Sequence, residues 1–231
     1  MSKEVDGYKK TFGEKLKEST DKFITFHKNL VKDYKQNTKK RLLGIGLFWL
    51  VFIVFLTIDQ LTKGLLFDSN KLGQATHDFG LFGIRPYYHD GVTIIPSKTI
   101  GVAIFVQIVS VILCLLIVYF SFIFKDKYLL TILALILSGV FGNMFDRFYC
   151  EKTIEGVPQV RDIIFLPWID KGTFNFADTS IFIALALSII MGIIYLFKDD
   201  KDEESKINED SYNIFFIPSD VKDFKEEKNN K

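Results

Sequence analysis

Residues 100–124 read IGVAIFVQIVSVILCLLIVYFSFIF, a run without a single charged side chain. A helix that spans the hydrocarbon core of a bilayer needs about 20 mostly apolar residues. Three further stretches meet this requirement, namely Leu42 to about Phe67, Tyr128 to about Phe145, and Ala177 to Phe197. A buried helix of a soluble protein rarely stays apolar on every side over such a length. The sequence therefore predicts an all-α membrane protein with four transmembrane helices.

Charge is concentrated outside these four stretches. The chain has 48% hydrophobic and 25% charged residues, but the charges lie mainly in the segments 1–41 and 198–231 and in short loops. This pattern excludes a uniform soluble domain. Two cysteines, Cys114 and Cys150, are too few for a disulfide scaffold. We expect one membrane domain over residues 42–197, between two charged tails.

Lys and Arg are distributed unevenly across the predicted spans. Twelve of them lie in the N-terminal tail up to Arg41, and others follow the second and fourth spans. Short loops rich in Lys and Arg stay in the cytoplasm, so both termini are predicted to be cytoplasmic. Residues 8–34 have some amphipathic spacing, which would suit a helix on the membrane surface. We favour a soluble, solvated tail for this segment.

Polar residues of the spans gather at the ends that this orientation places at the outer face. They are Asp59 and Lys63 in the first span, Asn143, Asp146 and Arg147 at the end of the third, Asn175 and Asp178 at the start of the fourth, and Asp162 in the preceding loop. A charged side chain costs about 2.5–3.5 kcal/mol at the bilayer centre on insertion scales. A layer of such residues on one side of the membrane indicates a functional polar site.

Several of these residues also have a purely structural interpretation. Asp59 and Lys63 are four apart, so they could form an ion pair that ends a span. Asp178 could cap the fourth helix, since a carboxylate suits a helix N-terminus. Asp146 and Arg147 could form a salt bridge at the interface. The spacing alone does not decide between these interpretations and a shared site.

The residue types restrict the chemistry that such a site could perform. The sequence has no Ser in a G-x-S-x-G setting, and its three His, at positions 27, 77 and 89, lack metal-ligand spacing. We therefore expect neither a metal nor a cofactor. Two carboxylates held close together cannot both ionise, so they share a proton. One then activates a water molecule and the other polarises a carbonyl, which is amide hydrolysis without a covalent intermediate.

Four motifs resemble those of the lipoprotein signal peptidase (signal peptidase II) family and occur in its order. They are Asp59-Gln-Leu-Thr-Lys63, Gly142-Asn-Met-Phe-Asp146-Arg147, Val160-Arg-Asp162-Ile-Ile164 and Phe174-Asn-Phe-Ala-Asp178-Thr-Ser-Ile181. The last is similar to the family's F-N-x-A-D-x-x-I element and is the most specific. The resemblance covers roughly residues 42–197.

The resemblance implies a role for each residue of the polar layer. Asp162 and Asp178 would be the catalytic aspartates. Asn143, Arg147 and Asn175 would line the substrate cleft, and Asp59, Lys63 and Asp146 would support it. The outer loops would form a small β-containing extracytoplasmic platform. The substrates would be prolipoproteins that carry a diacylglyceryl-modified cysteine and are cleaved just before it.

The expected partners follow from the resemblance and from the distribution of basic residues. Membrane lipid is the second expected partner. Nucleic acid is not expected, because no basic patch lies beside aromatic residues. We expect a monomer.

The sequence departs from the family's pattern in the first outer loop, where His89-Asp90-Gly91 stands in place of the family's Asn-x-Gly stretch. A transporter that uses the Asp layer as a proton or cation relay and a non-catalytic membrane scaffold are the competing functions.

Overall fold

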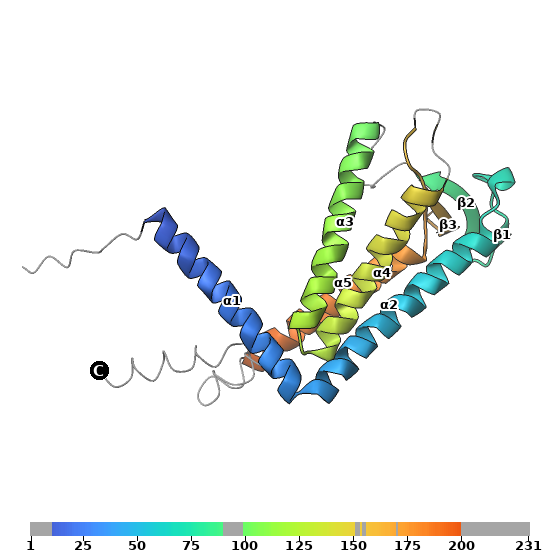
Figure 1. Cartoon of the computed structure of the whole chain (residues 1–231). Coiled ribbons are helices and arrows are strands. Elements are labelled where there is room, and N and C mark those ends of the chain that lie inside the picture. Colours follow the sequence, from blue (N-terminus) through green and yellow to red (C-terminus); the bar gives the residue numbers. More distant parts are fainter. Residues whose placement is uncertain (1–10, 90–98, 151–152, 154–155, 170, 200–231) are drawn as a thin grey trace, which may run out of the picture.

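Four long helices form a bundle in the computed structural model, with a small sheet at one end (Figure 1). The structure describes residues 11–89, 99–150, 153, 156–169 and 171–199, with side chains up to 195. The four helices are α2 (Thr38–Leu66), α3 (Ile100–Ile123), α4 (Lys127–Tyr149) and α5 (Phe176–Asp199). Each is long and apolar enough to cross a membrane. The four predicted spans are confirmed, with ends that differ by a few residues.

Helix α4 lies at the centre of the bundle. Half of its span is buried inside the protein, against 22% for α2 and 17% for α3 and α5. The main core cluster joins it to α2 and α3 and contains Phe48, Cys114, Ile117, Leu130, Ala134, Leu137 and Met144. The outward faces of the other helices carry exposed Leu, Ile, Val and Phe side chains, as expected for helices surrounded by lipid.

Glycines let α4 and α5 approach closely. A Cβ atom added to Gly139 would lie 2.5 Å from the carbonyl oxygen of Ala177 and 2.5 Å from Cγ1 of Ile181. A Cβ atom added to Gly142 would lie 2.7 Å from a carboxylate oxygen of Asp59. Small residues at helix interfaces permit such close backbone approach in membranes. The polar ends of α2, α4 and α5 therefore meet.

The sheet lies at the end of the bundle where these three polar helix ends meet (Figure 1). It is antiparallel with the order β1-β2-β3-β4, where the strands are β1 (His77–Asp78), β2 (Gly83–His89), β3 (Val160–Phe165) and β4 (Thr173–Phe174). In the central pair, Tyr87 is opposite Asp162 and His89 is opposite Val160. Strand β3 thereby holds Asp162 above the helix ends. The predicted small β platform is present.

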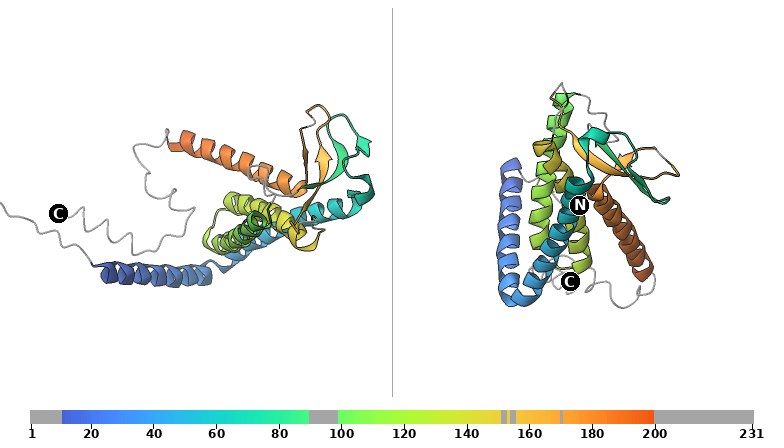
Figure 2. Two further views of the ribbon diagram at one scale, coloured as in Figure 1. Left: turned by 90° about the horizontal axis from the view of Figure 1, so that it is seen from above. Right: turned by 90° about the vertical axis from the view of Figure 1, so that its right-hand side faces the viewer.

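The N-terminal segment forms a helix, which a soluble tail did not lead us to expect. Helix α1 (Phe12–Gln36) begins at a capping box between Thr11 and Glu14 and lies at the outside of the bundle (Figure 2). It is joined to α2 through the single residue Asn37. Its many Lys residues suggested a solvated tail, but its amphipathic spacing and a buried Asp33–Arg41 ion pair account for an ordered helix. Residues 200–231 lie outside the described part of the chain.

Candidate active site

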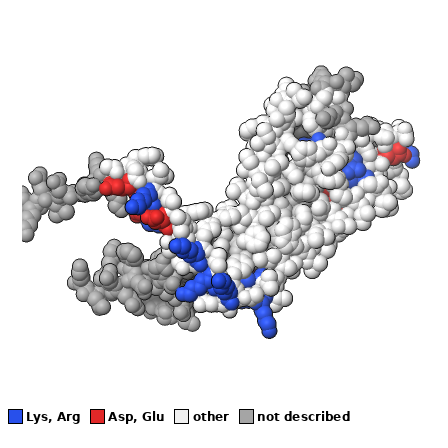
Figure 3. Space-filling model, in the orientation of Figure 1, with Lys and Arg blue, Asp and Glu red and all other residues white. Residues whose placement is uncertain are grey.

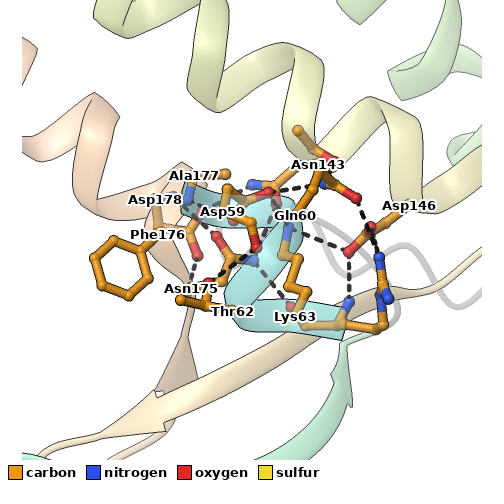
Figure 4. A network of polar contacts seen from close by, with 12 residues as sticks. Asp59, Gln60, Thr62, Lys63, Asn143, Asp146, Asn175, Phe176, Ala177 and Asp178 are labelled. Carbon is orange, nitrogen blue, oxygen red and sulfur yellow. Dashed lines mark hydrogen bonds and ion pairs between the residues drawn. The ribbon is translucent and has the colours of Figure 1, made fainter. Parts of the chain in front are cut away.

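The side chain of Lys63 forms the centre of the polar site (Figure 4). It is fully buried, and its Nζ lies 2.9 Å from Asp59 Oδ2 and 3.1 Å from Asp146 Oδ2. It also donates a hydrogen bond of 3.2 Å to Asn143 Oδ1. Both carboxylates are fully buried as well. Buried charges are tolerated only when they are paired and hydrogen-bonded, and this ammonium group meets that condition between α2 and α4.

Two residues that the sequence did not single out complete this network. Arg161 Nη2 lies 2.8 Å from Asp146 Oδ1, and its backbone N–H donates to the other carboxylate oxygen of Asp146 at 3.0 Å. Arg161 Nη2 also donates to Gln60 Oε1 at 3.2 Å. These contacts tie strand β3 to the ends of α2 and α4. The adjacency of Arg161 to Asp162 was the only available signal, because Gln60 has no spacing that marks it.

Helix α5 is attached to the same network at its first turn. The backbone N–H of Ala177 donates to Asp59 Oδ1 at 2.8 Å. Asp59 thus accepts from α5 with one oxygen and pairs with Lys63 through the other. The contact stabilises the carboxylate because the N-terminus of a helix presents free N–H groups and the positive end of the helix dipole.

Asn175 and Asp178 form a reciprocal cap at the start of α5. The backbone N–H of Asp178 donates to Asn175 Oδ1 at 2.9 Å, and the backbone N–H of Asn175 donates to Asp178 Oδ2 at 3.2 Å. This is the arrangement of a capping box. The structural interpretation of Asp178 as a helix cap is therefore correct as local geometry. The cap uses only Oδ2 of Asp178, and Oδ1 accepts a hydrogen bond from Asn143 Nδ2 at 2.9 Å.

The side-chain amide of Asn175 connects the two aspartates. Its Nδ2 donates to Asp162 Oδ1 at 2.9 Å and to Asn143 Oδ1 at 3.0 Å. Since Asn175 also binds Asp178 through its backbone, one buried residue contacts both carboxyl groups. Asn143, on α4, also donates a hydrogen bond to Asp178. The two amide side chains thus fix the relative positions of two acids that lie sixteen residues apart in the sequence.

Both aspartates line one cavity, which we call the aspartate cleft. Its volume is about 360 Å³. Its polar lining comprises His89, Ser110, Asn143, Arg147, Asp162, Thr173 and Asp178. The remaining walls are apolar and come from α3, α4, α5 and the sheet, with Val106, Val140, Val160, Phe174, Ile181 and Phe182. A cleft with a few convergent polar groups among apolar walls is typical of a site for an amphiphilic substrate.

The acidity of Asp162 is strongly perturbed. Burial raises the pKa of this carboxyl group, and the neighbouring charge of Asp178 raises it further, to about 8. The charge of Lys63 and the hydrogen bond from Asn175 lower this pKa, but both are smaller effects. At neutral pH the Asp162 carboxyl group is therefore mostly protonated. An acid that keeps its proton beside an ionised partner is the arrangement that acid–base catalysis by two carboxylates requires.

The structure brings all eight sequence-predicted site residues into one connected network. One sequence interpretation is wrong, because Asp146 pairs with Lys63 and Arg161 rather than with its neighbour Arg147. Arg147 instead lines the aspartate cleft, and its Nη1 donates to the backbone oxygen of Asn143 at 3.4 Å. Asp90 and Gly91 of the first outer loop lie outside the described residues. Within the described residues, no group of three or more His, Cys, Asp or Glu could hold a metal ion.

Comparisons with known proteins point to one family. The family described as Signal peptidase (SPase) II matches residues 51–194. A lipoprotein signal peptidase of Listeria monocytogenes serotype 4a (strain HCC23) is 29% identical over 157 residues, which cover 67% of this chain and 95% of the relative. A lipoprotein signal peptidase of Lactobacillus johnsonii is 28% identical over 161 residues, which cover 68% of this chain and 96% of the relative.

A solved structure gives the same result for the fold. It is described as a bacterial membrane enzyme and superposes with a TM-score of 0.55 at 26% identity, covering 71% of this chain and 96% of that chain. A second bacterial membrane enzyme has a TM-score of 0.53 at 26% identity and covers 64% of this chain and 92% of that chain. The similarity thus extends over nearly the whole length of each solved enzyme.

Proposed function

This chain belongs to the signal peptidase II family, and on that basis we propose that Asp162 and Asp178 are the aspartates with which it cleaves signal peptides from lipoprotein precursors. The chain is a membrane protease of the aspartic type. The observation that carries the assignment of the two residues is their shared contact with Asn175 at the edge of one cleft.

The environment of each aspartate suggests its role in the reaction. Asp162 is 4% exposed and has a raised pKa, so it holds the proton that is donated to the scissile carbonyl oxygen. Asp178 carries the negative charge and accepts a proton from a water molecule bound between the two carboxyl groups. The water oxygen attacks the carbonyl carbon and gives a tetrahedral gem-diol. The proton on Asp178 then passes to the amide nitrogen, the C–N bond breaks, and Asp162 regains its proton from the gem-diol.

Cleft residues from α4 provide the means to hold the substrate. Arg147 is close enough to Asp178 and Asp162 to interact with them electrostatically. Among the described residues, its side chain makes one long hydrogen bond, from Nη1 to the Asn143 backbone oxygen, so its other donors can bind a peptide carbonyl or a lipid ester. The apolar cleft walls, which include Val106 and Phe182, suit the acyl chains of a diacylglyceryl-modified cysteine. We place the scissile bond just before that cysteine.

The distribution of charge along the spans supports the orientation of the site. Both tails carry the excess of Lys and Arg, so we place both termini in the cytoplasm and the aspartate cleft near the outer face. The Asp, Lys and Arg residues of the described spans lie near their ends, as with Arg41 and Asp59 in α2. A proton or cation relay would need such groups through the depth of the membrane. The transporter alternative is therefore not favoured. The monomeric state stays a prediction.

Substitution of each proposed catalytic aspartate tests the assignment directly. Asp162→Asn and Asp178→Asn should each lower cleavage of a synthetic diacylglyceryl-cysteine precursor by at least about 100-fold, the usual range for loss of an acid–base group. Asp68→Asn, which changes a half-buried aspartate outside the cleft, is the matched control. All three proteins should insert and accumulate, and an unlipidated precursor should be a poor substrate. Near-normal cleavage by either cleft variant would show that the dyad is assigned wrongly.

A further inference from the structure

Helix α1 lies outside both the family match and the proposed reaction. The match begins at residue 51, whereas α1 ends at Gln36. The helix leaves the bundle at the end opposite the aspartate cleft, after a bend at Asn37, and its first half extends away from the other helices (Figure 1). Isolated helices are marginal in water and depend on the packing of an apolar face. What this face contacts therefore decides whether the first half of α1 stays helical.

One face of α1 is apolar along the whole helix. Its members recur at spacings of three, four and seven residues, which places them on one side of a helix. They are Phe12, Leu16, Phe23, Phe26, Leu30 and Tyr34. In the second half this face meets the end of α3, where Leu30 is 8% exposed and Tyr34 Oη donates to the backbone oxygen of Phe122 at 2.7 Å. In the first half Phe12, Leu16 and Phe23 are 83%, 58% and 60% exposed.

Lysines border the apolar face of α1 on both sides. Lys15 and Lys22 lie along one edge, and Lys17, Lys28 and Lys35 lie along the other. All five are exposed, and Lys22 also pairs with Glu18 at 2.8 Å. The acidic residues of the first half lie between the two rows, on the side opposite the apolar face. Lysines at such edges can keep their stems on apolar surface while their ammonium groups reach lipid phosphates.

The surroundings of α1 at the bundle indicate what its apolar face contacts. Tyr119, whose hydroxyl lies 3.1 Å from His27 Nε2, is 39% exposed on the membrane-spanning helix α3. Leu42 and Leu43 at the start of α2 are exposed as well, and Lys and Arg side chains gather over the junction of α1 and α2 (Figure 3). The apolar face of α1 thus continues the surface by which the spans contact lipid. An apolar face between rows of lysines is typical of a helix that lies in the interface of an anionic membrane.

We infer that α1 lies on the membrane surface, with its apolar face among the head groups of anionic phospholipids and its bordering lysines at their phosphates. The helix thereby enlarges the contact of the chain with the leaflet opposite the aspartate cleft. This inference needs neither the assignment of the two catalytic aspartates nor the orientation of the termini. It can therefore fail while the proposed function holds, and the reverse is also true.

The depth of α1 in a bilayer tests this inference on the full-length chain, in phosphatidylcholine vesicles with and without phosphatidylglycerol. A nitroxide label is attached to Leu16→Cys on the apolar face or to Asp21→Cys, which is the matched control on the exposed polar face. Both chains carry Cys114→Ala and Cys150→Ala, which remove the native thiols. Collisions with oxygen, which concentrates in lipid, and with a water-soluble nickel complex give the depth of each label.

A second measurement uses the unchanged chain, so it stands even if the labelled variants fail to fold. Phosphatidylglycerol with a photoreactive diazirine on an acyl chain is added to the vesicles, and mass spectrometry locates the residues to which it becomes attached. Attachment should favour the apolar face of α1, at Phe12, Leu16 and Phe23, over the polar face around Asp21. Attachment to both faces alike would contradict the inference.

We expect the label at position 16 to lie about 5–10 Å below the lipid head groups, as for other interfacial helices, and the label at position 21 to lie in water. The depth at position 16 should be greater with phosphatidylglycerol, and the same depth without it would overturn the role of the lysines. Equal access of the nickel complex to both positions would overturn the membrane contact itself.

Two other occupants of the apolar face would be recognised by a label at position 16 that is shielded from both oxygen and the nickel complex. Access that returns when the chain is ended at residue 199 would show that residues 200–231 cover the face. Spectral broadening that disappears on dilution with unlabelled chain would show that a second copy covers it. Either result would replace the membrane as the partner of α1.

Discussion

The raised pKa of Asp162 makes a quantitative prediction for the pH dependence of catalysis. The proposed reaction needs the protonated form of this carboxyl group, and the pKa of about 8 applies to the chain without substrate. An ordinary aspartate has a pKa near 3.9 and would be almost fully ionised at pH 7. With a pKa of about 8, the protonated fraction is about 90% at pH 7 and about 9% at pH 9. The value of kcat/KM should therefore fall about tenfold between these pH values, because kcat/KM reports the free enzyme.

The measurement is kcat/KM of the purified chain in detergent with a diacylglyceryl-cysteine peptide, at several pH values between 6 and 10. The midpoint of thermal unfolding, recorded at each pH, would separate loss of the acid from loss of the fold. Return of full activity when a sample at pH 9 is brought back to pH 7 would exclude irreversible damage. A value of kcat/KM that stays constant from pH 7 to pH 9 would refute the assignment of the proton to Asp162.

Two further predictions concern the packing that supports the site. Lys63→Met should lower the free energy of unfolding by about 3–5 kcal/mol, because it leaves the buried carboxylate of Asp59 without a cation and Asp146 with Arg161 alone. Lys71→Met, at an exposed position, should change it little, and an unchanged denaturation midpoint for Lys63→Met would contradict the network. Gly139→Ala should lower the free energy of unfolding by about 1–3 kcal/mol, because the new methyl group overlaps the Ala177 carbonyl oxygen. Gly46→Ala, whose added Cβ has no atom within 4 Å, is the matched control, and equal stability of the two alanine variants would show that α4 and α5 are not in close contact.

The spans could be predicted from the sequence because a lipid-surrounded helix must be apolar over its whole length. The helix ends were less predictable, since the hydrogen-bonded backbone continues past the apolar run. Helix α4 reaches Tyr149 because its polar last turn, with Asp146 and Arg147, is still helical. Helix α1 was underestimated for a related reason. Its Lys residues suggested a solvated chain, whereas its order rests on a capping box and on contacts with distant residues such as Lys125.

The sequence predicted which residues form the polar site, but not which carboxylate pairs with which cation. Helical spacing places Asp59 beside Lys63 and Asn143 beside Arg147 on single faces, and the structure keeps both relations. Which carboxylate meets which cation depends on how the helices and strand β3 come together. Arg161 was missed as a partner of Asp146 because fifteen residues and a change from helix to strand separate them. Contacts of this kind follow from tertiary structure alone.

The dependence of the site on α5 has a consequence for biogenesis. During synthesis, α2, α3 and α4 enter the membrane before the last span exists. Until α5 is inserted, Asp59 lacks its bond from the Ala177 N–H, and neither Asn175 nor Asp178 is present. A partly translated chain therefore contains Lys63 and its two carboxylates but lacks Asp178, one of the two proposed catalytic aspartates. With the proposed dyad, the site is complete only after the ribosome has delivered α5 to the membrane.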